Sequence, residues 1–175
     1  IVTTPEHYAF IKIAEGCNNR CAFCIIPYLR GRYRSRQLDD VLYEARMLAH
    51  SGVKELIVVA QDTSRYGTDF PEHKRLLPEL LRELCRIDGI YWIRIQYCYP
   101  EEIYEELIQV MKEEEKICHY LDLPIQHANN QILKRMGRRT SKEDLVQIIR
   151  TLREEIPDIV EPKTEAQDSA DAAVS

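Results

Sequence analysis

Cys17-Asn-Asn-Arg-Cys21-Ala-Phe-Cys24 places three thiols within eight residues, directly after the apolar segment 8–14 and Gly16. Clustered cysteines in a chain without a secretory pattern indicate metal binding rather than disulfides, and thiolates favour iron–sulfur clusters, zinc and copper(I). A structural zinc site normally has four protein ligands, and no second pair follows at zinc-finger spacing. Three cysteines on a cubane cluster leave one iron open. The stretch therefore predicts a 4Fe–4S site; zinc, or three apolar core cysteines, are the alternatives.

Length and composition are those of one ordinary globular domain. The chain has 175 residues, 45% of them hydrophobic and 30% charged, which is enough for a proper core. It contains no apolar run of membrane-spanning length and no signal segment, so we expect a cytoplasmic location and no membrane partner. The formal net charge of -5 argues against DNA binding through bulk charge.

Strand and helix patterns alternate along the chain. Apolar segments predict strands, and amphipathic segments with caps predict helices. The expected strands are 8–14, 56–60, 91–97, 117–123 and the start of a fifth at 157–160. The expected helices are 38–48, 78–87, one opened by Pro100, Glu101 and Glu102, one capped by Asn129 or Asn130, and one with a capping box at Thr140 to Glu143. This order predicts an α/β fold with a parallel sheet, open or closed into a barrel.

Polar residues follow each expected strand. Gln61 follows the second strand, Tyr97 the third and Gln126 the fourth. Chemistry in parallel α/β folds collects at the carboxyl ends of strands. Each residue alone is explained by loop hydrogen bonding, but together with the cysteines they predict a cofactor pocket. The other cysteines, Cys85, Cys98 and Cys118, are widely spaced and are expected to be packing residues.

The spacing Cys-x3-Cys-x2-Cys after a first strand resembles that of the radical S-adenosylmethionine (radical SAM) enzymes. The resemblance implies that Cys17, Cys21 and Cys24 are the metal ligands and catalytic centre, holding a 4Fe–4S cluster whose open iron chelates SAM. One electron then cleaves the sulfonium to a 5'-deoxyadenosyl radical. It also implies that Phe23 lies beside the adenine, with Gln61, Tyr97 and Gln126 as further cofactor contacts.

A narrower resemblance is to the methylthiotransferase branch of that family. It implies sulfur insertion at the β-carbon of an aspartate in a small-subunit ribosomal protein, with an electron donor such as flavodoxin or ferredoxin. The branch that modifies an adenosine of transfer RNA is the alternative, and it has different residues at these motifs. The motifs that carry the resemblance are Ala14-Glu-Gly-Cys17, Arg34-Ser-Arg36, Ala60-Gln-Asp62, Tyr97-x-Tyr99-Pro100, Asp122-Leu-Pro-Ile-Gln-His127 and Arg135-Met-Gly-Arg138.

The chain departs from that branch at both ends. The resemblance predicts a linker from a missing N-terminal domain at 1–7, a partial radical SAM barrel at 8–160 and a disordered tail at 161–175. The barrel would be truncated after about four of its βα units. The family's second, sulfur-donating cluster belongs to the missing domain, so we expect this fragment to be incomplete for catalysis.

Arginines are concentrated after the cysteine stretch. Within seventeen residues lie Arg20, Arg30, Arg32, Arg34 and Arg36, with Tyr28 and Tyr33 between them. Arginine pairs bidentately with carboxylates and phosphates, so the segment could hold an acidic substrate, the SAM carboxylate or RNA. A solvated face or counter-charge for an anionic cluster explains it equally well. A non-catalytic binding module that uses this segment is a further alternative.

Overall fold

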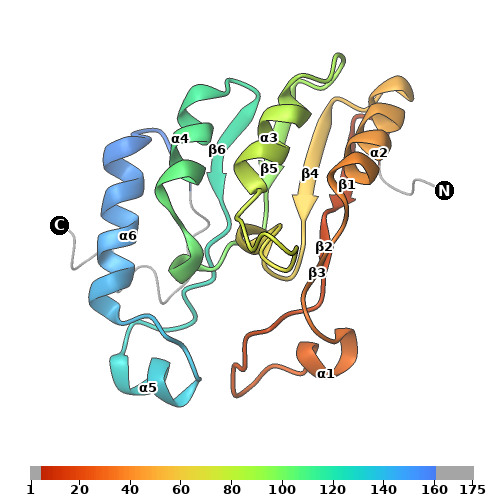
Figure 1. Ribbon diagram of the computed structural model, residues 1–175. Helices are drawn as coiled ribbons and strands as arrows, with labels where there is room; N and C mark the ends of the chain where they lie inside the picture. The colour runs from red at the N-terminus through yellow and green to blue at the C-terminus, as the bar shows by residue number, and fades with distance from the viewer. Residues whose placement is uncertain (1–4, 161–175) are drawn as a thin grey trace.

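The computed structural model describes residues 5–160, which form a parallel four-stranded sheet covered by helices (Figure 1). The strands lie in the order β1-β4-β5-β6, and each neighbouring pair is parallel. The bounds are Tyr8–Lys12 for β1, Glu55–Val59 for β4, Trp92–Ile95 for β5 and Ile117–Leu121 for β6. The predicted α/β class with a parallel sheet is confirmed.

Helices connect the strands and cover one face of the sheet. The connecting helices are α2 (Leu38–His50), α3 (Leu77–Cys85) and α4 (Glu105–Glu113), while α5 (Asn130–Arg135) and α6 (Lys142–Glu155) follow β6. Because each new strand is added on the same side, right-handed crossovers place the connecting helices on one face. The helices cover apolar side chains that lie in register on adjacent strands. One such row across β1, β4 and β5 is Ala9, Leu56 and Ile93.

The opposite face of the sheet is more open. Its row in register is Phe10, Ile57 and Arg94, and Phe10 is 49% exposed. The Arg94 guanidinium donates to Glu55 at 2.7 Å and lies 5.1 Å from the centre of the Tyr120 ring. One face of the sheet therefore carries the core, and the other presents polar and aromatic side chains.

Several short elements follow the strand ends and were not predicted from the sequence. A two-strand antiparallel ladder joins β2 (Ala14–Glu15) to β3 (Arg34–Ser35), and α1 (Ile26–Arg30) lies between them. Two 3₁₀ turns are η1 (Thr63–Arg65) and η2 (Pro100–Glu102). Elements of two or three residues, and a helix of only five, are too short to show a hydrophobic pattern, so tertiary contacts decide them.

Two predicted helix starts are wrong. Pro100 to Glu102 form the separate turn η2, and α4 begins at Glu105 after the extended residue Tyr104. The capping box is Ser141 with Asp144, not Thr140 with Glu143: the Asp144 N–H donates to Ser141 Oγ at 3.1 Å, and the Ser141 N–H donates to Asp144 Oδ2 at 2.9 Å. The Thr140 Oγ1 atom is buried without a hydrogen-bond partner among the described residues, so it caps no backbone N–H. Asn129 caps α5 as predicted, accepting from the N–H groups of Gln131 and Ile132.

Of the predicted start of a fifth strand at 157–160, only Val160 pairs with the sheet, and residues 157 and 158 lie in a turn. Val160 forms a parallel bridge with Tyr120, and its carbonyl accepts from the Leu121 N–H at 3.1 Å. The predicted disordered tail at 161–175 lies outside the described residues, as do residues 1–4 of the predicted linker. The proposed domain boundaries therefore stay a prediction. Between residues 5 and 160, no helix has both the length and the apolar character needed to cross a membrane.

Candidate cluster and cofactor site

The cysteine loop begins at Gly16, a position that accommodates no residue other than glycine. Gly16 has a φ of 80°, and a Cβ there would lie 2.2 Å from the Arg32 carbonyl oxygen. That close approach lets the Cys17 N–H donate to the Gly31 carbonyl at 3.2 Å. Asn18 adds a second contact, since its Oδ1 accepts from the Tyr33 N–H at 3.1 Å. The start of the loop is therefore held against the arginine segment.

The end of the loop is held by the turn after α5. The Ala22 N–H donates to the Met136 carbonyl at 2.9 Å. Gly137 packs below the loop with a φ of 74°, and a Cβ there would meet the Arg20 carbonyl oxygen at 2.9 Å. The Cys24 N–H closes a turn by donating to the Cys21 carbonyl at 3.0 Å. Contacts from distant parts of the chain thus fix the loop at both ends.

The three thiols differ in burial and share one electrostatic environment. Cys17 and Cys21 are buried, and Cys24 is half-buried. Burial raises the pKa of the Cys17 thiol, and the nearby Asp62, Cys21 and Cys24 raise it further, while the Asn19 N–H opposes the shift by donating to Cys17 Sγ at 3.4 Å. A thiol of this kind is protonated when free and releases its proton on binding a metal centre.

Between residues 5 and 160, no three His, Cys, Asp or Glu side chains are close enough together to hold a single metal ion. This finding concerns one ion. An iron–sulfur cubane is larger than an ion, so its cysteine ligands stand further apart. The donor set here is three thiols on one anchored loop, which is the set that iron–sulfur chemistry uses.

Tyr99 and Arg138 lie beside Cys21. The sequence predicts Tyr99 at this edge, since it follows the third expected strand together with Tyr97, but it does not predict Arg138. Burial raises the pKa of the Tyr99 hydroxyl, as do the neighbouring thiols of Cys21 and Cys17. The Arg138 guanidinium lies 4.5 Å from the centre of the Tyr99 ring and donates to Glu101 at 2.9 Å. Both residues belong to motifs quoted above, but their contact joins segments 39 residues apart in the sequence.

Gln61 and Asp62 follow β4 with their polar groups enclosed. The Gln61 Oε1 atom is buried without a hydrogen-bond partner among the described residues. Asp62 is fully buried, which raises the pKa of its carboxyl to about 6, while the Ser64 hydroxyl opposes the shift by donating to Oδ1 at 2.7 Å. The Tyr33 hydroxyl donates to the Asp62 carbonyl at 2.9 Å. The first loop after β1 is therefore tied to the loop after β4.

Tyr97 and Gln126, after β5 and β6, have left-handed backbone conformations. Their φ angles are 61° and 66°, a region that costs free energy for residues other than glycine and that clusters at functional sites. Both side chains are exposed, as is Phe23 at 57%. Since β1, β4, β5 and β6 are parallel, the predicted cofactor residues all follow strands at one edge of the sheet.

The arginine segment is partly committed to internal contacts. Arg36 donates to the Lys12 carbonyl at 2.8 Å and to Glu44 at 2.5 Å, and Arg30 lies 3.7 Å from Glu15. Tyr33 is buried. Arg30, Tyr33 and Arg36 therefore help to position the cysteine loop. Fewer side chains of the arginine segment remain available to bind a ligand.

The remaining cysteines lie away from the loop. Cys85 and Cys98 are buried and Cys118 is half-buried, and burial raises the pKa of each thiol, that of Cys85 to about 12. Thiols that burial keeps protonated act as packing groups. This arrangement agrees with the role predicted for them.

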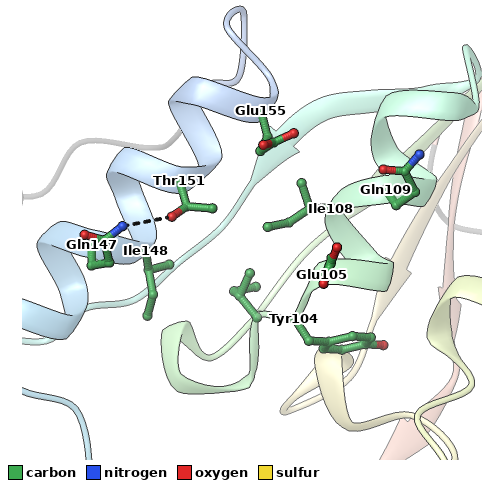
Figure 2. Close-up of a pocket in the computed structure, with 9 residues that line it drawn as sticks. Tyr104, Glu105, Ile108, Gln109, Gln147, Ile148, Thr151 and Glu155 are labelled. Carbon is green, nitrogen blue, oxygen red and sulfur yellow. Dashed lines mark hydrogen bonds between the residues drawn. The ribbon is translucent and has the colours of Figure 1, made fainter.

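A cavity of about 420 Å³ opens between α4 and α6, on the helical layer (Figure 2). Ile108 and Ile148 line it with the charged groups of Glu105 and Glu155, and Gln147 donates to Thr151 on its α6 side. None of the predicted cofactor residues lines this cavity, so it is separate from the cysteine site.

Comparison with known proteins places the chain among radical SAM proteins. The family model described as the radical SAM superfamily matches residues 11–161. The chain is 62% identical over 157 residues to the ribosomal protein uS12 methylthiotransferase RimO of Lachnoclostridium phytofermentans, covering 90% of this chain and 36% of the relative. It is 56% identical over 159 residues to the protein of the same name from Clostridioides difficile, with 91% and 36% covered. The chain thus spans about a third of the length of these relatives.

Solved structures show the same fold. The radical SAM methyltransferase TsrM of Kitasatospora setae, with tryptophan and a SAM analogue bound, matches with a TM-score of 0.65 at 21% identity, covering 89% of this chain and 30% of that one. The cobalamin-dependent SAM radical enzyme OxsB matches with a TM-score of 0.66 at 15% identity, covering 84% and 22%.

Proposed function

The chain belongs to the radical SAM superfamily, and from this we propose that it is the cluster- and SAM-binding core of a methylthiotransferase that modifies an aspartate of the small-subunit ribosomal protein uS12. The relatives at 62% and 56% identity that carry this name support the assignment. They favour the ribosomal-protein branch over the branch that modifies transfer RNA.

We propose Cys17, Cys21 and Cys24 as the ligands of a 4Fe–4S cluster. The observation that carries the proposal is one loop with three thiols, anchored at Gly16 and at the Ala22 to Met136 hydrogen bond. When bound, the cluster and SAM supply the one-electron cleavage of the SAM sulfonium. The chain's own part is to hold the three thiols in place, and these thiols release their protons when the cluster binds.

Four residues are proposed to bind SAM. The exposed Phe23 ring offers an apolar face to the adenine, and the buried, unpartnered Gln61 Oε1 offers a hydrogen-bond acceptor. Tyr97 and Gln126 hold strained left-handed conformations at the same edge, which fits residues whose placement serves a ligand rather than stability.

Partners follow from the proposed reaction. They are uS12 as substrate and an electron donor such as flavodoxin or ferredoxin, in the cytoplasm. The sulfur would come from a second cluster carried by another domain. We therefore expect a polypeptide of these 175 residues to cleave SAM at most slowly and to form no methylthiolated uS12. A product detected by mass spectrometry would contradict this expectation.

Anaerobic iron–sulfur reconstitution tests the cluster proposal. We expect the chain to gain a broad visible absorption band and iron and sulfide in the ratio of a 4Fe–4S cluster, and Cys21→Ala to lose both. Cys118→Ala is the control, since that half-buried thiol lies on β6 and not on the cysteine loop. Zinc without iron, or equal iron in Cys21→Ala, would overturn the proposal.

A further inference from the structure

The turn η2 carries two neighbouring acids that bind arginines from other segments. Arg138, in the turn after α5, donates to Glu101 at 2.9 Å. Arg75, in the loop before α3, donates to Glu102 at 2.7 Å, and Arg139 donates to Glu102 at 2.8 Å. The proposed function gives neither acid a role. These ion pairs join η2, which follows β5, to the turn that follows α5.

The pair of Glu101 and Arg138 is the most enclosed of these contacts. The Arg138 side chain is 2% exposed and that of Glu101 13%, whereas the Arg139 side chain is 65% exposed. The Arg138 guanidinium also lies 4.5 Å from the centre of the ring of Tyr99, the residue before η2. One guanidinium is therefore held by a carboxylate and an aromatic ring that are two residues apart.

The surroundings of Arg138 contain more positive than negative charge. Arg138 lines a polar pocket of about 380 Å³ beside Cys21, and among the described residues of that lining four are arginines and one, Glu101, is an acid. Three nitrogen atoms in the lining, Arg65 Nε, Arg138 Nε and Asn19 Nδ2, have no hydrogen-bond partner among residues 5–160. Within the same residues, Glu101 is the one carboxylate paired with Arg138. Without Glu101, a buried guanidinium would lack a compensating anion, which is strongly unfavourable.

The turn that carries Arg138 also holds the cysteine loop. The Met136 carbonyl accepts from the Ala22 N–H at 2.9 Å. The Arg20 carbonyl oxygen approaches Gly137 so closely that a Cβ there would lie 2.9 Å from it. Two residues of the turn thus contact the loop, and the next residue is Arg138. Because the three residues are consecutive, a shift of Arg138 moves the contacts with the loop.

We propose that Glu101 is a positioning residue for the cysteine loop. By pairing with Arg138, it fixes the turn 136–139, and this turn fixes Ala22. Glu101 therefore acts on the loop through Arg138, from a segment that follows a different strand. The inference rests on the proposed function only for the purpose of the loop, because each contact between Glu101 and Ala22 belongs to the fold itself.

Amide hydrogen exchange of the full chain, followed by nuclear magnetic resonance, tests the inference. Glu101→Gln keeps the shape of the side chain and removes its charge. We expect the exchange rate of the Ala22 N–H to rise about tenfold, because the turn that accepts its hydrogen bond opens more often. The amides of β4 should exchange as in the wild type. A role in global stability alone would raise the exchange rates of the strand as well.

Glu55→Gln is the matched control. Glu55 accepts from Arg94 at 2.7 Å, and that guanidinium lies 5.1 Å from the centre of the Tyr120 ring. The sheet thus repeats the arrangement of carboxylate, guanidinium and ring, and Glu55→Gln should leave the Ala22 exchange rate unchanged.

Arg138→Lys tests the same pair from its other side and serves if Glu101→Gln does not fold. Lysine keeps the charge but loses the planar guanidinium that stacks and pairs at once, so the Ala22 exchange rate should again rise. An unchanged Ala22 rate in a folded variant of either residue would overturn the inference. Equal increases at Ala22 and in β4 would do the same.

A second readout separates this inference from the proposed function. After reconstitution, the electron paramagnetic resonance signal of the reduced cluster should differ between Glu101→Gln and the wild type, because groups around a metal site orient its ligands. The signal of Glu55→Gln should match that of the wild type. Identical signals in all three proteins would count against the role of Glu101. If the wild type binds no cluster, the proposed function fails, and the exchange experiment still decides what Glu101 does.

Discussion

Two regions of the molecule are stabilised by different interactions: the sheet with its covering helices, and the loops at the carboxyl edge of the sheet. In the sheet, Leu56 and Ile93 are fully buried in register, and α2, α3 and α4 cover them. In the loops, positive φ angles, close glycine contacts and ion pairs fix the chain, and several polar atoms have no partner. The sheet thus supplies stability, while the loops hold groups in positions that stability alone does not favour.

Leu56→Ala should have the largest effect on folding. Leu56 is 0% exposed in β4, between β1 and β5. Losing its buried side chain should lower the free energy of unfolding by about 2–5 kcal/mol, measured by urea denaturation. At a temperature where the variant is still folded, iron binding should be intact. A loss of iron from folded Leu56→Ala would show that the two regions are not separable.

Asp62→Asn should change how stability depends on pH. The folded carboxyl has a pKa raised to about 6 from 3.8, chiefly by burial. The folded state therefore binds more protons than the unfolded state between these values, and stability falls as the pH rises through this window. Relative to Asp62→Asn, the wild type should lose about 2 kcal/mol between pH 4 and pH 7.

Urea denaturation at several pH values measures this difference. Asp69→Asn is the control, since Asp69 is exposed. A pH dependence that is the same in wild type and Asp62→Asn would show that Asp62 is ionised in the folded protein, and that the loops do not retain a buried neutral acid.

Gly16→Ala should damage the cysteine loop more than the sheet. A Cβ would lie 2.2 Å from the Arg32 carbonyl oxygen, so the backbone must move, and overpacking typically costs about 1–3 kcal/mol. Gly52→Ala is the control, because Gly52 also has a positive φ, 103°, but no atom within 4 Å of its Cβ position. Iron bound per folded chain should fall in Gly16→Ala and stay unchanged in Gly52→Ala.

Tyr97→Gly should have the smallest effect on stability. Glycine removes a left-handed strain of about 1 kcal/mol but adds a similar entropy cost in the unfolded state, so the free energy of unfolding should change by less than about 1 kcal/mol. SAM affinity of the reconstituted chain, measured by anaerobic calorimetry, should fall. His73→Gly, at φ 51° in a loop between η1 and α3, should leave SAM affinity unchanged; equal affinities in both variants would remove Tyr97 from the site.

Short stretches of sequence predicted the order of helices and strands, because the hydrophobic pattern of one element involves only residues that are close together in the chain. The strand 56–60 and the helix 38–48 appear with small shifts. The strand is a continuous apolar run, and the helix has apolar residues at helical spacing. The capping box lies one residue later than predicted: Thr140 and Ser141 are both acceptable caps by residue type, and the structure has Ser141 paired with Asp144. The short elements β2, β3 and α1 had no period to reveal them.

The sequence by itself determined the order of strands and helices, the family through Cys17, Cys21 and Cys24, and the edge at which the polar residues gather. These follow from spacing and from the direction of parallel strands. Only the tertiary structure decided that Arg138 stacks on Tyr99 beside Cys21, and that Arg65, Arg138 and Asn19 leave donors unpaired in one pocket. Such contacts join distant segments, and their free energy depends on burial and on partners that no local pattern records.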